Sequence, residues 1–573
     1  MCGIIAVIGR IGRRQAPAPD HLLALLAEAE GYLAASTTTE KLRMAAVAVT
    51  KIDTALRGVA GLWALLENNS LHSELSDRSA AIQQRLAAIE QSFDASLASN
   101  DGDDISKQDV ELRNQQMVIL KDALWSVARD RLPHAQQVRE LAGSKLPHQH
   151  SAAAFSSLQL ALSALDRLEV RGRDSAGISV IVSDVDAENA ELATLLQRRD
   201  HDRLFQNASV RLVDGNLNFV YKHAAEIGEL GDNVRALRQS IIADELLQAA
   251  FRQPEVQSLV LGHTRWASVG IISQPNAHPL NNEETTGQAN PYVIGALNGD
   301  VDNHHDLVKT FDLQLDDAIT TDAKVIPTLV SHQMKSGHDL TNGFRRTVSS
   351  FEGSVAIAAA SANEPDKLAL ALRGSGQALY IGLAEDIYVV ASEPYGVIES
   401  CNRYLRMDGE TPGNLSNPTT SRGQVVILDR NQAGELSGIT RQAYDATDLP
   451  VSEKDFSIAA VTTRDIDRGD FPHYLLKEIG ESPNSLQKTL RGRIIQKGDR
   501  LEVTLPESSL PKSAVAALQA GTTRRILVIG QGTAAVAGQA IAGAIADAVS
   551  ESGIFVQATP ATELSGFGLG DEM

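Results

Sequence analysis

The sequence predicts an α+β fold interrupted by a long helical insertion, and three observations indicate this fold class. Residues 2–8 form a short β-branched apolar run, as expected of a buried strand. From about residue 20 to 146, apolar residues recur at the three- and four-residue spacing of amphipathic helices. Strand-like runs separated by helical patterns then continue to about residue 445. Together they indicate a layered domain with a helical segment inserted after its first strand.

The inserted segment, residues 13–148, indicates an antiparallel helical bundle or a long helical hairpin. One of its helices carries apolar residues three, four and seven positions apart, at Val110, Met117, Leu120, Leu124 and Val127. The polar stretch 99–107 (SNDGDDISK) predicts an exposed tip between two helices. We expect the insertion to be an autonomous arm that the surrounding fold can do without. The alternative is a packing element that covers the domain.

The later strands and a second unit complete the predicted organisation. Six strand-like runs follow the insertion, at 178–182, 259–262, 292–296, 354–360, 387–391 and 425–428. A different unit starts near Phe471, and its strand 525–529, glycine turn, alanine-rich helix and second strand 553–558 predict a parallel α/β unit. The predicted domains are 2–12 with 149–445, the insertion 13–148, a linker and start of the second half at 446–500, and a partial unit at 501–573.

Composition narrows the class of protein. The 573 residues are 43% hydrophobic and 22% charged, which is typical of globular chains. The 52 Lys and Arg against 72 Asp and Glu, net charge -20, argue against a dedicated nucleic-acid binder. No apolar run is long enough for a membrane span, and no basic segment precedes the first strand as in a signal peptide. The distant pair Cys2 and Cys401 predicts a reduced, cytoplasmic protein.

Cys2 is the first candidate catalytic residue. Removal of Met1 would make Cys2 the N-terminus, with its own α-amine beside its thiol. An α-amine titrates near about 7.7–8.0, so part of it is neutral and can accept the thiol proton. One residue would then supply both nucleophile and base. The alternative is a small buried cysteine at the start of a strand.

Seven ordered motifs carry a resemblance to a known family. They are MCGII at 1–5, LEVRGRDSAGISV at 168–180, GHTRWASVG at 262–270, NAHPL at 276–280, LNGDVDNH at 297–304, TTDAKVI at 320–326 and HYLLKEIGESPNSL at 473–486. The chain thereby resembles the class II glutamine amidotransferases, and among them the glutamine–fructose-6-phosphate aminotransferases. The resemblance covers nearly everything outside the insertion.

This resemblance implies a fold, a reaction and partners. The fold is a four-layer αββα N-terminal-nucleophile glutaminase domain, followed here by a partial α/β sugar-isomerase (SIS) domain. The reaction is hydrolysis of L-glutamine and transfer of the ammonia to fructose 6-phosphate, which gives glucosamine 6-phosphate. No cofactor and no metal are implied. The expected assembly is a homodimer through the isomerase half, or a complex with a chain that completes it.

The resemblance also assigns the core of the glutamine site. The Asn298 side-chain amide and the Gly299 N–H are implied as the oxyanion hole, although propensity alone makes this pair a type I′ hairpin turn. Arg265 offers a donor fork for the glutamine α-carboxylate, and Asp322 an anion for its α-ammonium. The alternatives are a surface ion pair for Arg265 and a helix N-cap for Asp322.

Four further residues complete the implied glutamine site. Trp266 and Ser268 lie in a loop that resembles the family's glutamine lid, and Arg171 lies at a strand entry beside the nucleophile. His278 matches the histidine of the NAHP motif, where a purely structural role is the alternative.

Two departures in this half concern the link to the other half. The usual histidine after the RWAS stretch is Val269, and the residue before the Asn-Gly pair is Leu297 instead of a histidine. They leave the glutaminase chemistry in place and put in doubt the interface through which the two halves communicate.

The second half departs further. The run Gly530 to Ala535 resembles a dinucleotide fingerprint, but no acid ends the second strand as that reading needs. It resembles instead the first turn of a sugar-isomerase domain, which makes Thr533 the implied sugar contact, while Ala534 replaces the usual serine.

The hydroxyl-rich loop that would cradle the sugar phosphate is expected just after residue 573. We therefore predict a truncated or split enzyme that releases glutamate and makes no glucosamine 6-phosphate. Two alternatives stay open: another class II amidotransferase of the phosphoribosyl-pyrophosphate type, and a regulatory sugar-phosphate sensor.

Overall fold

The computed structural model describes residues 2–34, 38–98, 107–199, 201–224, 229–287, 290–412, 422–490, 493–497, 500–503, 505 and 509–567. The predicted removal of Met1 and almost all of the predicted tip at 99–107 lie outside these ranges. The chain forms two compact units, Met1–Asp470 and Phe471–Met573. Each unit is described by itself.

The first unit is built on two antiparallel sheets. The larger has nine strands in the order β15-β12-β10-β11-β1-β5-β2-β4-β3. Their bounds are β1 Gly3–Gly9, β2 Ser175–Ser183, β3 Ser209–Val213, β4 Asn216–Ala224, β5 Gln257–Arg265, β10 Tyr380–Ala384, β11 Ile387–Ala391, β12 Arg403–Arg406 and β15 Phe456–Ile458. The smaller has six strands in the order β14-β13-β9-β8-β7-β6. Their bounds are β6 Leu280–Asn281, β7 Val293–Gly299, β8 Val355–Ser361, β9 Glu364–Arg373, β13 Gln424–Asp429 and β14 Ile439–Ala443.

Alternation along the strands places the two sheets face to face. In the central strand β1, Ile4, Ala6 and Ile8 point into one apolar cluster that also contains alternate residues of β7, β8 and β9. Ile5 and Val7 point to the opposite face, toward a second cluster that contains helix α7. Because both faces of β1 are covered, its sequence is a continuous apolar run instead of an alternating one.

Helices cover the outer face of each sheet. Helix α7 (Gln149–Leu168) packs on β1 and β5 of the larger sheet, and α12 (Val325–Lys335) and α13 (Leu340–Ser349) pack on the smaller one. The other helices after the insertion are α8 Ala190–Gln197, α9 Asp232–Ile242, α10 Glu245–Ala250 and α11 His304–Thr310. The predicted α+β class is confirmed.

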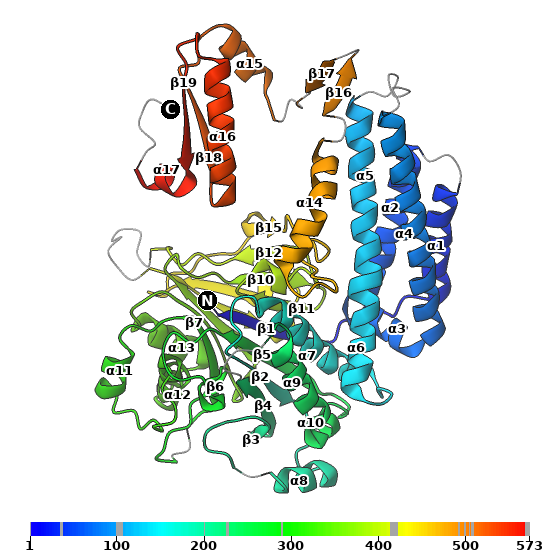
Figure 1. The fold of residues 1–573 in the computed structure, drawn as a ribbon. Helices are drawn as coiled ribbons and strands as arrows, with labels where there is room; N and C mark the ends of the chain where they lie inside the picture. Colours follow the sequence, from blue (N-terminus) through cyan, green and yellow to red (C-terminus); the bar gives the residue numbers. More distant parts are fainter. Residues whose placement is uncertain are drawn as a thin grey trace. The chain divides into compact units, whose positions relative to one another are not determined.

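The insertion consists of six α-helices and one π-helical turn in its described part. Their bounds are α1 Pro19–Leu33, α2 Thr39–Leu56, α3 Gly58–Glu67, α4 Asn69–Ala98, α5 Lys107–Trp125, the π-helical turn Ser126–Arg131, and α6 Leu132–Ala142. Figure 1 shows α1, α2, α4 and α5 side by side as a bundle. Helices α3 and α6 pack instead on α7, and apolar residues of the insertion share one core with it. The insertion therefore covers the domain at its base, as the alternative prediction had it, and only the bundle extends as an arm.

A buried charge cluster joins the base of the insertion to the sheet domain. The Arg131 guanidinium donates to Asp53 Oδ1 at 2.9 Å and to the backbone carbonyl of Glu399 at 2.7 Å. Asp53 also accepts from Arg57, at 2.7 and 2.9 Å, and the Glu399 carboxylate pairs with Arg167 of α7. The π-helical turn adds one residue to the helix ladder just where Arg131 enters this cluster.

We expect Arg131→Met to destabilise the protein by about 3 kcal/mol, because it removes a buried partner of Asp53 and leaves the Glu399 carbonyl unpaired. Urea unfolding followed by circular dichroism measures this. Arg43→Met, which breaks an exposed pair with Glu40 on the same insertion, should leave the unfolding midpoint unchanged. Equal midpoints for both variants would show that the cluster does not hold the insertion in place.

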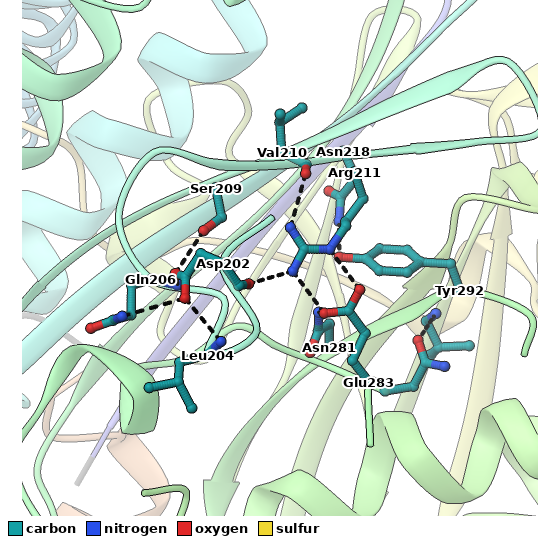
Figure 2. A network of polar contacts seen from close by, with 12 residues as sticks. Asp202, Leu204, Gln206, Ser209, Val210, Arg211, Asn218, Asn281, Glu283 and Tyr292 are labelled. Carbon is teal, nitrogen blue, oxygen red and sulfur yellow. Dashed lines mark hydrogen bonds and ion pairs between the residues drawn. The ribbon is translucent and has the colours of Figure 1, made fainter. Parts of the chain in front are cut away.

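A polar network fastens the edges of the two sheets to each other (Figure 2). Arg211 of β3 pairs with both carboxylate oxygens of Glu283, at 2.6 and 2.7 Å. Asp202 accepts from the N–H groups of Leu204 and Gln206 at 3.0 and 2.7 Å, and its backbone carbonyl accepts from Arg211. Because Glu283 is the second residue after the edge strand β6, these bonds tie the hairpin β3–β4 to the smaller sheet.

The second unit contains the predicted parallel pair of strands. Its elements are α14 Tyr474–Leu490, β16 Ile494–Lys497, β17 Arg500–Val503, α15 Lys512–Gln519, β18 Arg525–Gly530, α16 Thr533–Ala548, β19 Phe555–Pro560 and α17 Ala561–Phe567. Strands β18 and β19 are parallel, and α16 packs on them. Four apolar side chains of this layer are more than half exposed: Ile529, Val536, Ile541 and Phe555. None of the described helices in either unit has the length and apolarity needed to cross a membrane.

Candidate active site around Cys2

The first strand of one sheet and the end of a strand of the other bring Cys2 next to Asn298. Cys2 immediately precedes β1, and Asn298 and Gly299 are the last residues of β7. The Cys2 backbone N–H donates to Asn298 Oδ1 at 3.3 Å, across 296 residues of sequence. The two residues that the sequence predicted as nucleophile and oxyanion donor are thus in direct contact.

The Cys2 thiol is held by the backbone of Trp266, just after β5. The Trp266 N–H donates to Cys2 Sγ at 3.3 Å, and the thiol lies 3.5 Å from the Trp266 carbonyl oxygen. Burial raises the pKa of the Cys2 thiol, while the Trp266 N–H and the Arg265 charge lower it. The thiol therefore needs a base close by to form a thiolate at neutral pH, and the main chain already fixes the position of the sulfur.

The Asn298–Gly299 pair does not form a hairpin turn, so that prediction from propensity is wrong. Strand β7 pairs with β8, but helices α11, α12 and α13 intervene between the two strands. Gly299 has φ +105°, and a Cβ there would lie 2.0 Å from the Ser354 carbonyl oxygen. Only glycine fits here, because the Ser354 carbonyl occupies the space that a side chain would need.

Arg265 and Asp322 are both buried, and neither alternative prediction for them holds. The Arg265 guanidinium donates to the carbonyls of Ile271, at 3.0 Å, and Val269, so it forms no surface ion pair. Asp322 is the first residue of a 3-10 turn whose N-cap is Thr321, so it is no N-cap. Its Oδ2 accepts the Val301 N–H at 2.7 Å, and burial raises the pKa of its carboxyl. Their charges attract each other: Asp322 raises the pKa of Arg265 against the larger lowering effect of burial.

The loop after Arg265 is linked to the end of β7. The Trp266 side chain is 58% exposed. The Ser268 hydroxyl donates to Asp300 Oδ1 at 2.7 Å, and the Ala267 N–H donates to Asp174 Oδ2 at 2.9 Å. Sequence reasoning missed Asp300 and Asp174, although both lie inside motifs that it quoted.

His278 supports the strand that carries Asn298. The Leu297 N–H donates to His278 Nδ1 at 3.4 Å, while His278 Nε2 lies 3.3 Å from the Thr321 hydroxyl. His263 Nε2 lies 2.8 Å from the Leu297 carbonyl oxygen, and the two imidazoles pack with centroids 4.4 Å apart. The backbone N–H and the backbone carbonyl of Leu297 are thus each in contact with a histidine. His263 was not predicted, although it is part of the GHTRW motif.

We expect His263→Gln to change the pH dependence of stability more than stability at pH 7. Burial lowers the pKa of His263 to about 3, so the native imidazole is neutral, whereas in the unfolded chain it takes up a proton below about pH 6.5. The unfolded state therefore binds more protons between these values, and stability falls as pH falls. Glutamine keeps a donor for the Leu297 carbonyl without titrating. The free energy of unfolding of the variant minus that of wild type should therefore be about 2–3 kcal/mol larger at pH 4.5 than at pH 7.

Urea unfolding at pH 7 and pH 4.5 measures this difference. A constant offset between the two proteins at both pH values would contradict a neutral, buried His263.

Two predicted site residues remain, Arg171 and Thr533. Arg171 forms an ion pair with Glu393. Thr533 is the first residue of α16 in the second unit, exposed, after Gly532 at φ +57°. Within the described ranges, no group of three or more His, Cys, Asp or Glu side chains is placed to hold a metal ion.

Comparison with known proteins gives relatives of one kind. No protein-family model matches the sequence. A glutamine–fructose-6-phosphate aminotransferase of Pseudomonas putida is 28% identical over 331 residues, which cover 58% of this chain and 41% of that enzyme. The enzyme of Bacillus thuringiensis is 26% identical over 375 residues, 65% of this chain and 49% of its own. The sequence resemblance is confirmed. The chain spans less than half the length of these relatives.

The solved structures add little. The glutamine phosphoribosylpyrophosphate amidotransferase of B. subtilis, complexed with ADP and GMP, matches with a TM-score of 0.31 and 18% identity over 50% of this chain and 47% of that one. A similarity at this level supports no further conclusion.

Proposed function

We propose that the first unit is a glutamine amidotransferase domain that hydrolyses L-glutamine to glutamate and ammonia, with Cys2 as its nucleophile. The contact between the Cys2 N–H and Asn298 Oδ1 carries this proposal, because it joins the residue that attacks to the residue that stabilises the product of attack. The helix–sheet–sheet–helix packing supports assignment to the four-layer αββα N-terminal-nucleophile fold.

The reaction begins when Met1 is removed and the new α-amine takes the Cys2 thiol proton. The sulfur attacks the δ-carbonyl carbon of glutamine, and the carbonyl oxygen becomes an oxyanion. Asn298 Oδ1 is already occupied by the Cys2 nitrogen, so the Nδ2 amide protons, with the Gly299 N–H, are the donors that face the oxyanion. The amine returns its proton to the leaving ammonia, and water then hydrolyses the thioester to glutamate.

Glutamine is selected by the charges of its α-carboxylate and α-ammonium groups. Two guanidinium N–H groups of Arg265 donate to the carbonyls of Val269 and Ile271, so its remaining guanidinium N–H groups can donate to the α-carboxylate. Asp322 Oδ2 accepts the Val301 N–H, and Oδ1, which also accepts from the Thr321 hydroxyl at 3.4 Å, is the oxygen that we assign to the α-ammonium. Trp266 and Ser268 form the loop over the substrate, and we assign Arg171 and His278 to the same site.

The proposed acceptor rests on the relatives' names. Because the relatives are glutamine–fructose-6-phosphate aminotransferases, fructose 6-phosphate is the proposed ammonia acceptor and glucosamine 6-phosphate the product. The second unit supplies part of a sugar-isomerase domain with Thr533 as sugar contact, in a cytoplasmic homodimer or with a chain that completes it. No cofactor takes part.

The test is labelling with 6-diazo-5-oxo-L-norleucine, a glutamine analogue that alkylates a catalytic thiol. Intact mass and peptide mapping should show a chain without Met1 and a single adduct on Cys2, which excess glutamine suppresses. Retained Met1, or an adduct elsewhere, would favour the regulatory sensor. Assays of glutamate and of glucosamine 6-phosphate in the presence of fructose 6-phosphate then test the two halves separately.

A further inference from the structure

A cavity lies within the first unit, where the insertion meets the sheet domain. Its volume is about 380 Å³. One wall is the insertion, through the end of α2, helix α3 and helix α6; the opposite wall is α7 with the β10–β11 hairpin. Among the described residues, its lining contains none of the predicted glutamine-site residues. It is therefore a separate site, at the opposite end of β1 from Cys2, since Gly9 lines it.

The cavity has the size and character of a small-molecule site. Ligand pockets in proteins typically enclose about 300–1,000 Å³ and combine a mostly apolar lining with a few polar groups. Here the apolar surface comes from both walls, with Leu56, Leu62 and Leu65 on the insertion and Ala153, Ala154 and Leu160 on α7. Because neither wall alone encloses the space, the cavity exists only in a chain that carries the insertion.

The charged residues around the cavity leave one arginine with a weakly engaged donor. Four arginines line it, Arg10, Arg57, Arg131 and Arg403, with the carboxylates Glu385 and Asp386. Arg10 pairs with Asp386 and Glu435, Arg131 with Asp53, and Arg403 with Glu453. His134, also in the lining, adds no charge at neutral pH, because burial lowers its pKa to about 4.

Arg57 is the cation with capacity left for a ligand. Its Nε and one terminal nitrogen bind Asp53, but its other terminal nitrogen has only a 3.4 Å contact with the Ser400 carbonyl. Asp53 is shared with Arg131, so one carboxylate serves two guanidinium groups. A ligand carboxylate could bond to this terminal nitrogen of Arg57 without displacing Asp53.

We propose that this cavity binds a small amphiphilic anion, with its apolar body against Leu62 and Leu160 and its acidic group at Arg57. The proposal is independent of the glutamine chemistry. It gives the insertion a function as one wall of a ligand site.

Isothermal titration of the full chain with sodium octanoate tests it, with 1-octanol as the uncharged control of equal length. We expect octanoate to bind with a Kd below about 1 mM, and 1-octanol at least tenfold more weakly. Arg57→Leu should remove the preference for the anion, since Arg131 still pairs with Asp53 in that variant. Arg43→Leu, on the exposed surface of the insertion, should keep it.

Leu160→Trp places a large ring in the cavity and should weaken octanoate binding at least tenfold; Ala153→Phe is a second filling variant should the first not fold. A native-like circular dichroism spectrum and a cooperative urea unfolding transition verify that each variant is folded. The proposal would be overturned if the wild type did not bind octanoate. It would also be overturned if Arg57→Leu and both filling variants bound octanoate as the wild type does, because the ligand would then lie on an exposed apolar surface.

Discussion

Cys2→Ala should abolish glutamine hydrolysis, whereas Cys401→Ala should retain at least half of it. Removal of a catalytic nucleophile typically costs on the order of 10⁶ in kcat. The Cys2 N–H contacts Asn298, and the Cys2 sulfur accepts from the Trp266 N–H within reach of the Arg265 charge. Cys401 is buried beside the insertion, burial raises the pKa of its thiol to about 11, and its sulfur donates to the Arg403 carbonyl at 3.3 Å.

Glutamate release measured with purified proteins decides between the two cysteines. Circular dichroism and the unfolding midpoint should show that both variants are folded. Turnover in Cys2→Ala above the background of heat-inactivated protein would falsify the nucleophile assignment.

Asn298→Asp should lower kcat for glutamine hydrolysis by about 10²–10³-fold with little change in stability. Aspartate keeps an oxygen where Oδ1 accepts the Cys2 nitrogen, so the contact that positions the nucleophile survives. It lacks the amide protons that we assign to the oxyanion, and it places a negative charge beside the developing one. The substitution therefore separates the positioning role of Asn298 from its electrostatic role.

Asn298→Ala is the matched variant, since it removes both groups. Steady-state kinetics should give a similar or larger loss of kcat for alanine, with KM for glutamine within a few-fold of wild type for both. If Asn298→Asp keeps more than a tenth of wild-type kcat, Asn298 is not an oxyanion donor and acts only on Cys2.

Much of the architecture follows from residues near one another in the chain. The continuous apolar run of β1 predicted a strand covered on both faces, and it lies between two apolar clusters. The strand–glycine–helix–strand pattern after Arg525 predicted the parallel pair β18 and β19. Periodicity predicts such elements because each depends on which face of one short segment is buried.

Local reasoning failed where a longer-range contact outweighed propensity. Asn298-Gly299 has the composition of a type I′ turn, but the chain continues through three helices before it returns as β8. Thr321-Asp322 has capping composition, but the Asp322 carboxylate is engaged by the Val301 N–H. His263 was passed over because a histidine in a strand gives no local signal of the peptide that it will contact.

By itself, the sequence determined the α+β class, the helical nature of the insertion and the motifs that tie Cys2, Arg265, Asn298 and Asp322 to one chemistry. Only the tertiary structure decided which atoms of these residues remain free for a substrate, because Cys2 and Asn298 are 296 residues apart and belong to different sheets. It also decided that the insertion covers α7 and encloses a cavity with it. Helical periodicity identifies a buried face, but the partner of that face is set by packing between distant segments.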